Sequence, residues 1–159
     1  MKVINIHRRI INQPKIKIAE LLNTLASEND RLLATDKWPR MKLDKGLQVD
    51  SKGSHGSIRY TIQAYYTGEL IEFKFSKPKG FIGTHKFEII ELGNNRTEIK
   101  HTIDMTTSAK ATLMWSLIIR WLHDAYIEDA FDKVEKQFSI VKNEYKWNIW
   151  VRFLRWLLK

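Results

Sequence analysis

The chain has 159 residues, no cysteine and a formal net charge of +9 at pH 7. This length suits one domain with a single core, and the absence of cysteine excludes disulfides and thiolate chemistry. No apolar run approaches the roughly 18 residues of a membrane span. Positive charges interrupt the start, MKVINIHRRI, before a signal peptide could form. We expect a cytoplasmic protein, with peripheral attachment to the inner membrane face as an open alternative.

Much of the positive charge lies near the C-terminus. Residues 141–159 hold five Lys or Arg and one Glu, a net +4 out of the total of +9. Elsewhere basic and acidic residues alternate, and the sequence has no helix-turn-helix, RNA-binding-sheet or zinc-finger motif. Because charge alone is weak evidence for nucleic-acid binding, nucleic acid is not an expected partner.

The N-terminal quarter of the chain predicts a strand followed by two helices. Residues 2–11 alternate as a strand does, with isoleucines on one side and three polar residues on the other, Asn5, His7 and Arg9. Pro14 then opens a stretch with apolar residues at helical spacing. A second short helix is expected after it, capped by Ser27 or Asn29 and ended before Pro39.

The middle of the chain predicts an antiparallel sheet. Residues 46–107 contain alternating runs broken by glycine, and the last two runs form a hairpin around Gly93-Asn94-Asn95. The alternation places His85 and His101 on the apolar faces of these two strands. We expect both histidines to point inward.

The last third changes to helical periodicity. From Ala109 to about Lys142 the sequence predicts one long helix. Its expected buried stripe is Ile127, Phe131, Val134, Phe138 and Val141. A strand, two helices, a sheet and a final long helix form the order of an α+β fold in which the sheet wraps the last helix.

Four separated segments resemble a known family. They are GSHGSIRYTI, PKGFIGTHKFEIIELG, WLHDAYIEDAFDKVEKQF and KWPRMKL. Over roughly residues 2–138 the chain resembles bacterial members of the SRPBCC group, the START-like and polyketide-cyclase-like helix-grip proteins. The resemblance implies a curved sheet around a long C-terminal helix, with a deep cavity for an apolar or amphipathic ligand, but no single activity. We therefore predict a helix-grip ligand-binding domain at 1–143 and an amphipathic tail helix at 144–159.

The long helix offers polar residues to the expected cavity. Steps of four and three residues back from Ile127 lead to His123, Arg120 and Ser116, so this stripe turns polar toward its start. These residues would orient the polar end of a ligand, and Arg120 could pair with a carboxylate or phosphate. Exposure to solvent is the alternative. With the expected wall groups of the sheet, the candidate ligand-binding residues are Ser116, Arg120, His123, His85, His101 and Tyr60.

Three of these residues, His85, His101 and His123, could converge and suit zinc or iron. Metal sites usually pair such ligands with carboxylates at fixed spacing, which this trio lacks. We therefore predict no metal and no cofactor, and expect structural or hydrogen-bonding histidines. The acidic residues further along the helix are expected to form a solvated face balanced by nearby lysines, namely Glu128, Asp129 and Asp132.

The chain ends in an apolar and basic segment, KWNIWVRFLRWLLK. As a helix, it would have one narrow polar stripe, formed by Asn148, Arg152, Arg155 and Lys159. Such a helix needs a cover, which could be a lipid surface, the protein's own domain or a second subunit in a homodimer. The residues expected to contact a membrane or partner are Trp147, Trp150, Phe153, Trp156, Arg152 and Arg155.

These features lead to two main hypotheses of function. The first is carriage of a hydrophobic or lipid-like small molecule, with an anionic membrane surface as a further partner of the tail. The second is a polyketide cyclase-like or hydrolase-like enzyme, in which His123 acts as general base and Asp124 orients it. A third, an interaction module that uses the tail to bind another protein, also stays open.

Overall fold

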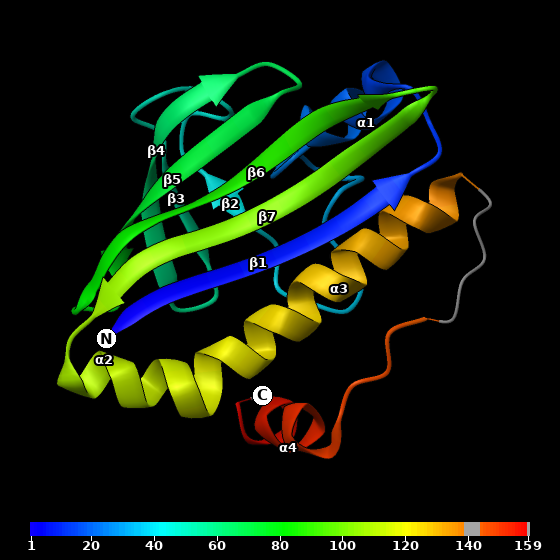
Figure 1. Ribbon diagram of the computed structural model, residues 1–159. Helices are drawn as coiled ribbons and strands as arrows, with labels where there is room; N and C mark the ends of the chain where they lie inside the picture. The colour runs from blue at the N-terminus through cyan, green and yellow to red at the C-terminus, as the bar shows by residue number, and fades with distance from the viewer. Residues whose placement is uncertain (139–143, 159) are drawn as a thin grey trace.

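A seven-stranded antiparallel sheet and a long helix form the body of the computed structural model, which describes residues 1–138 and 144–158 (Figure 1). The strands pair in the order β1-β7-β6-β5-β4-β3-β2. Within the described residues the strands are β1 Lys2–Ile11, β2 Lys42–Leu43, β3 Lys52–His55, β4 Ile58–Tyr66, β5 Leu70–Lys77, β6 Phe81–Gly93 and β7 Arg96–Thr107. Because β1 pairs with β7, the start of the chain lies close to the helix that follows β7.

The long helix consists of three consecutive segments: α2 Ala109–Met114, a π-helical turn η1 Trp115–Ile119, and α3 Arg120–Gln137. Two shorter helices are α1 Lys15–Leu22, which follows β1, and α4 Ile149–Leu157, near the C-terminus. Figure 1 shows the long helix running beside β1, with α4 beneath it. The predicted α+β helix-grip architecture with an additional C-terminal helix is confirmed.

The hairpin of β6 and β7 has the turn that the sequence predicts. Gly93 pairs with Arg96, and the two loop residues Asn94 and Asn95 have φ angles of 54° and 55°. A two-residue type I′ loop requires this left-handed conformation at both positions, and asparagine tolerates it. The inward faces of the two strands carry apolar residues and two histidines, all buried: His85, Phe87, Ile89, Ile99, His101 and Ile103.

The second short helix expected after α1 is absent, because residues 23–41, all of them described, form turns. Ala26 has a φ of 62°, which a helix does not allow. The buried carboxylate of Asp30 accepts hydrogen bonds from the backbone N–H groups of Ala26, Leu32 and Leu33. These bonds satisfy donors that would otherwise pair within a helix, so they stabilise turns instead.

The polar side of β1 faces α3, whereas Ile4, Ile6 and Ile10 face outward. Ile4 is 62% exposed, while Asn5, His7 and Arg9 contact carboxylates of α3. Residues two apart on a strand advance about 6.6 Å, and residues four apart on a helix about 6.0 Å. Because the two steps nearly match, successive polar residues of β1 meet successive acidic residues of α3. We call this the β1–α3 seam, formed by Asn5, His7, Arg9, Asp124, Glu128, Asp132 and Glu135.

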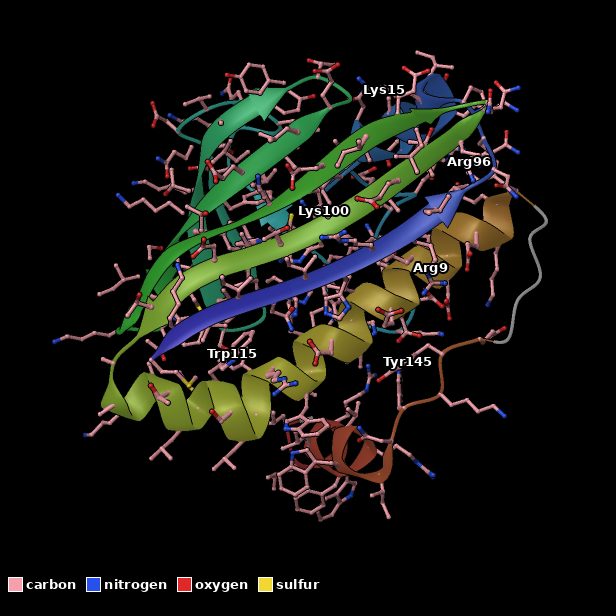
Figure 2. All side chains as sticks on the ribbon, viewed as in Figure 1. Arg9, Lys15, Arg96, Lys100, Trp115 and Tyr145 are labelled. Atoms are coloured by element: carbon pink, nitrogen blue, oxygen red, sulfur yellow. The ribbon has the colours of Figure 1, made fainter. Side chains whose placement is uncertain are left out.

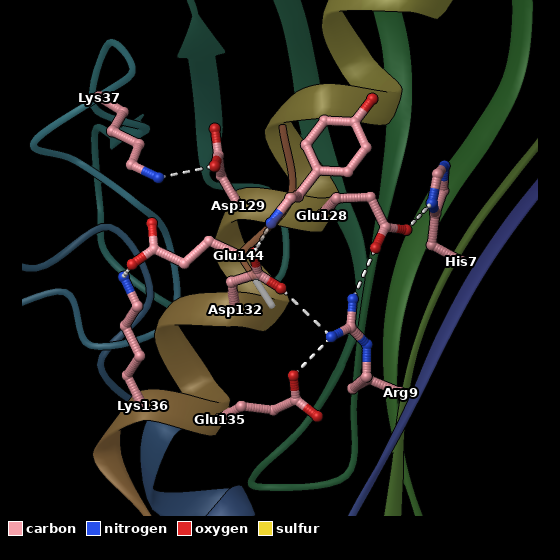
Figure 3. Close-up of polar contacts among 10 residues, drawn as sticks. His7, Arg9, Lys37, Glu128, Asp129, Asp132, Glu135, Lys136 and Glu144 are labelled. Atoms are coloured by element: carbon pink, nitrogen blue, oxygen red, sulfur yellow. Dashed lines mark hydrogen bonds and ion pairs between the residues drawn. The ribbon is translucent and has the colours of Figure 1, made fainter. Parts of the chain in front are cut away.

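The sequence suggested that Glu128, Asp129 and Asp132 are solvated, but all three form ion pairs: Asp129 and Asp132 are buried, and Glu128 is half-buried. Arg9 donates to Glu128 at 2.6 Å, to Asp132 at 3.2 Å and to Glu135 at 2.5 Å (Figure 3). Asp129 is 1% exposed and accepts hydrogen bonds from three side chains. The donors come from segments far away in the sequence, which is why the local charge pattern of the helix did not predict the burial.

Helix α4 packs on the domain through one face only. Val151 and Leu154 are buried, while Trp156 is 72% exposed. The side chain of Asn148 accepts a hydrogen bond from the backbone N–H of Val151 at 2.9 Å and so caps the start of the helix. Among the described helices, none is long and apolar enough to cross a bilayer. Four predicted features lie outside the described residues: the end of the long helix near Lys142, Val141 of the buried stripe, Lys159 of the polar stripe and the domain boundary after residue 143.

Candidate ligand cavity

A cavity of about 580 Å³ lies between the sheet, the long helix and α4. Small-molecule sites commonly have volumes of about 300–1,000 Å³, so this cavity can hold a ligand of ordinary size. Most of its wall is apolar, and aromatic side chains supply much of that surface: Trp38, Phe75, Phe81, Phe87 and Trp115.

Four of the five histidines of the chain line the cavity: His55, His85, His101 and His123. His85 Nδ1 lies 3.4 Å from His101 Nε2, and the ring centres of His101 and His123 are 4.9 Å apart. Burial lowers the pKa of His85 to about 3 and that of His55 to about 4, and repulsion from His123 adds to both effects. Burial also lowers the pKa of His101 and His123. The four rings are therefore neutral at pH 7 and offer hydrogen bonds rather than charge.

Several polar atoms of the wall are buried without a hydrogen-bond partner within residues 1–138 and 144–158. They are Tyr60 Oη, Tyr126 Oη, His55 Nδ1, His85 Nε2, His101 Nδ1, both ring nitrogens of His123, and Arg155 Nη1. An unpaired buried polar atom costs about 1–3 kcal/mol, so proteins nearly always pair such atoms with protein, water or ligand. Their concentration in one cavity favours an occupant with hydrogen-bonding groups as well as apolar surface.

The cavity wall contains four of the six candidate ligand-binding residues: Tyr60, His85, His101 and His123. The other two, Ser116 and Arg120, do not line it. Both are exposed, Arg120 with 57% of its side chain. The neighbouring apolar stripe of the helix, which includes Ile119 and Leu122, faces the cavity instead.

A different cause applies to each of these two residues. Arg120 shares the stripe of His123 and Ile127, which do line the cavity, but its Nε lies 3.7 Å from Asp124 Oδ2, so its guanidinium pairs with that carboxylate instead of facing the cavity. The π-helical turn η1 has more residues per turn than an α-helix, so α-helical steps misplace Ser116. Burying apolar side chains against this wall also costs less than burying an unpaired guanidinium.

The guanidinium at the cavity comes from Arg155 of α4, which the sequence assigned to membrane or partner contact. Its Cζ lies 4.2 Å from the ring centre of Trp38 and 4.1 Å from that of Trp147, so cation–π attraction holds it. Its Nη2 donates to the carbonyl oxygen of Lys37 at 2.7 Å. Arg155 is one of the residues that line the cavity, and its Nη1 is buried without a hydrogen-bond partner among the described residues. The sequence signal was an arginine within an aromatic segment, but that pattern did not reveal that α4 docks at the cavity.

The other residues assigned to membrane or partner contact lie in two places. Trp147 packs against Trp38 with a ring-centre distance of 5.6 Å. In contrast, Arg152 and three aromatic residues of α4 are exposed. Trp150 Nε1 donates to the carbonyl oxygen of Leu117 at 2.9 Å, so α4 adjoins the start of the long helix. Together they expose what we call the apolar patch: Leu113, Leu117, Trp121, Trp150, Phe153 and Trp156.

Comparison with known proteins supports the fold and no more specific relationship. No family model and no curated protein matches the sequence. Among solved structures, a protein from Nitrosospira multiformis matches with a TM-score of 0.65 and 11% identity, covering 86% of this chain and 96% of that one. Norcoclaurine synthase from Thalictrum flavum, in complex with dopamine and hydroxybenzaldehyde, matches with a TM-score of 0.64 and 11% identity over 86% of this chain and 88% of that one.

A START superfamily protein from Mycobacterium smegmatis matches with a TM-score of 0.55 and 12% identity, covering 85% of this chain and 98% of that one. The architecture is thus the helix-grip fold of START-like proteins, as the resemblance in the sequence implied. This fold encloses a cavity between its sheet and its long helix, and the present chain keeps that cavity.

Proposed function

We propose that this protein binds and carries an amphipathic, lipid-like molecule in its cavity. The observation that carries the proposal is a mostly apolar cavity of about 580 Å³ whose buried polar atoms lack partners among the described residues. The apolar body of the ligand would contact the rings of Phe81, Phe87 and Trp115. Its polar groups would bond His85, His101 and Tyr60.

Arg155 indicates the charge of the ligand. It is the one permanently charged side chain among the described residues of the cavity wall. Its Nη1 is buried and without a hydrogen-bond partner in the described part of the chain. A carboxylate or phosphate is the natural partner of a guanidinium. The preferred ligand is therefore an anionic amphiphile, with its head group near α4 and its apolar part between the sheet and the long helix.

A matched pair of probes tests this assignment. A fatty acid and a fatty alcohol of the same chain length are compared for their ability to displace a fluorescent lipid from the full-length protein. Wild type should prefer the acid, and Arg155→Gln should lose most of that preference. Arg152→Gln, which changes an exposed arginine of the same helix, should keep it.

The ratio of the two affinities cancels any general weakening of the cavity in the variant. Equal affinity of wild type for the acid and the alcohol would reject the anionic head group. Wild type that binds neither probe and shows no co-purified lipid in native mass spectrometry would reject the carrier function itself.

An enzyme is the second candidate, because His123 lies in the cavity wall. A general base normally has an orienting partner within hydrogen-bond distance. Asp124 Oδ1 lies 3.6 Å from His123 Nδ1, and Asn5 at 2.9 Å and His7 at 3.1 Å contact that oxygen more closely. We therefore favour carriage. Turnover of a bound ligand that is lost in His123→Ala while ligand binding is kept would favour the enzyme.

We further propose that the apolar patch attaches the protein to an anionic membrane. Tryptophan and phenylalanine are suited to the boundary between lipid head groups and acyl chains. Exposed basic residues, Lys110, Arg120 and Arg152, lie on the same two helices as the patch. Attachment there would place the end of the cavity formed by α4 next to the source of a lipid ligand.

A further inference from the structure

A second cluster of polar side chains lies where β1 meets α3, beside the cavity. His7 Nε2 is 3.1 Å from Asp124 Oδ1, and His123 Nδ1 is 3.6 Å from the same oxygen. The three residues are half-buried, and one potential ligand atom from each lies within 4.8 Å of the others. Imidazole nitrogens and a carboxylate oxygen are typical ligands of zinc and other divalent transition metals.

The separations of the two histidine nitrogens from Asp124 Oδ1 fit a single ion. Two ligand atoms that each lie about 2.1 Å from a metal are about 3.0 Å apart at a right angle and about 3.4 Å apart at the tetrahedral angle. The separations of 3.1 Å and 3.6 Å are close to these values. We propose that His7, His123 and Asp124 form a binding site for a divalent transition metal of the zinc type.

The surrounding side chains orient the proposed ligands. His7 Nδ1 bonds Glu128 Oε1 at 2.7 Å, which directs Nε2 toward Asp124. Metal-binding histidines almost always donate their other N–H to a carboxylate, a carbonyl oxygen or water. The remaining carboxylate oxygens also have partners: Arg9 bonds Glu128 Oε2 at 2.6 Å, and Arg120 Nε lies 3.7 Å from Asp124 Oδ2.

Two side chains at this site, the proposed ligand His123 and its neighbour Asn5, have buried polar atoms that the contacts of the seam do not satisfy. Both ring nitrogens of His123 lack a hydrogen-bond partner in the described part of the chain, and so does Asn5 Oδ1. Asn5 Nδ2 lies 2.9 Å from Asp124 Oδ1. Because the two ends of an amide are assigned from their hydrogen bonds, turning this amide over would direct its oxygen at the site. The ion would then have four protein ligands, and His123 Nδ1 would gain a partner.

The proposed ion would join the edge strand to the long helix. His7 and Asn5 belong to β1, whereas His123 and Asp124 belong to α3. His123 also lines the cavity, so the ion would lie in the cavity wall. This inference does not rest on the proposed ligand, because the geometry of the site is complete without it.

Zinc binding to the full-length protein, stripped of metal with a chelator, tests the inference. Burial lowers the pKa of His7, but its contacts with Asp124 and Glu128 outweigh this effect and raise the pKa to about 9, so a proton competes with the ion. We expect isothermal titration at alkaline pH to give one Zn²⁺ per chain. His7→Gln and Asp124→Asn should each weaken binding by about tenfold or more. His55→Gln, the matched control, removes a cavity histidine outside the site and should leave zinc affinity unchanged.

The outcome that overturns the site is zinc binding that is undetectable in wild type or equal in wild type and His7→Gln. Thermal unfolding of wild type with and without Zn²⁺ gives a second measurement that needs no variant. An ion that binds the folded chain raises its Tm, so an unchanged Tm overturns the inference even if the variants do not fold. Fatty-acid displacement on the same samples shows separately whether ligand carriage stands.

Discussion

The indole Nε1 of Trp147 donates a 2.8 Å hydrogen bond to Asp129, a carboxylate of α3 that is only 1% exposed. The same carboxylate accepts from Trp38 and Lys37, each at 2.8 Å. Asp129 thus fixes both indole rings that enclose the guanidinium of Arg155. One buried acid of the long helix therefore positions the C-terminal segment at the cavity.

Removing the Trp147 hydrogen bond should loosen this attachment. Trp147→Phe keeps an aromatic ring but leaves Asp129 with one donor fewer, so we expect a loss of about 1–2 kcal/mol in the free energy of unfolding. Urea unfolding measures it. Trp156→Phe is the control, because that side chain is 72% exposed and its substitution should change stability little. Equal stability of the two variants would contradict the anchoring role.

The β1–α3 seam should depend strongly on Arg9. Arg9→Met leaves the buried carboxylates of Asp132 and Glu135 without the guanidinium that lies 3.2 Å and 2.5 Å from them. Breaking a buried ion pair by removing one partner typically costs about 3–5 kcal/mol. We expect urea unfolding to show a loss of free energy of unfolding at or below this range, because the Arg9 side chain is 20% exposed.

Arg8→Met provides the matched control for the seam. Arg8 is the neighbour of Arg9, lies on the opposite face of β1 and is exposed. Its substitution should change the free energy of unfolding by less than about 0.5 kcal/mol. A similar loss in both variants would mean that the charge of β1, rather than the contacts of Arg9, stabilises the fold.

The neutral histidines of the cavity should make the protein sensitive to acid. Burial lowers the pKa of His85 from 6.5 to about 3, with repulsion from His123 and His55 adding to the shift. Between these pH values the unfolded chain binds a proton at this position and the folded chain does not, so stability falls as the pH falls. At about pH 5, one such group lowers the free energy of unfolding by about 2 kcal/mol relative to neutral pH.

His85→Phe tests the source of this acid sensitivity. The ring of His85 stacks on Phe73 and Phe75 at centre distances of 4.7 Å and 4.9 Å, so phenylalanine suits the same place. Urea unfolding at neutral pH and at about pH 5 should show a smaller difference in the variant than in wild type, by about 2 kcal/mol. An unchanged difference would show that His85 does not contribute. The other titratable groups facing it are Tyr60 and His101.

The sequence predicted those parts of the fold that short-range patterns determine. Alternation along β6 and β7 placed His85 and His101 inward, and the Asn94-Asn95 loop gave the hairpin register. Helical periodicity gave the long helix. These features follow from backbone geometry within a dozen residues, which a single sequence records.

The parts that were missed depend on contacts between distant segments. Ser116 was assigned to the wrong face of the long helix, because the π-helical turn interrupts the α-helical period, and Arg120 pairs with Asp124 instead of facing the cavity. The acidic face of α3 is satisfied by residues of β1 more than 100 positions away. Arg155 reaches the cavity only because the C-terminal segment folds back on the domain. No local pattern contains these pairings.

Membrane attachment through the apolar patch is the last prediction. Figure 2 shows aromatic side chains of α4 pointing away from the sheet. Phe153 is 44% exposed and Trp156 is 72% exposed, so replacing both with serine should remove apolar contact with lipid without disturbing the core. We expect at least a tenfold loss of co-sedimentation with vesicles that contain phosphatidylserine, since burial of one large side chain contributes about 1.5–3 kcal/mol.

Point variants are a sharper test than removal of the tail, because truncation would also delete Arg155 from the cavity wall. Ile82→Ser is the control, since Ile82 is 71% exposed on β6 and is not one of the residues of the patch. Wild type should bind anionic vesicles more strongly than neutral ones, because the basic residues of the two helices add electrostatic attraction that salt weakens. Vesicle binding unaffected by the double substitution would exclude the patch as the attachment surface. A mass in solution that rises with concentration and falls in the double variant would show that a second copy covers it instead.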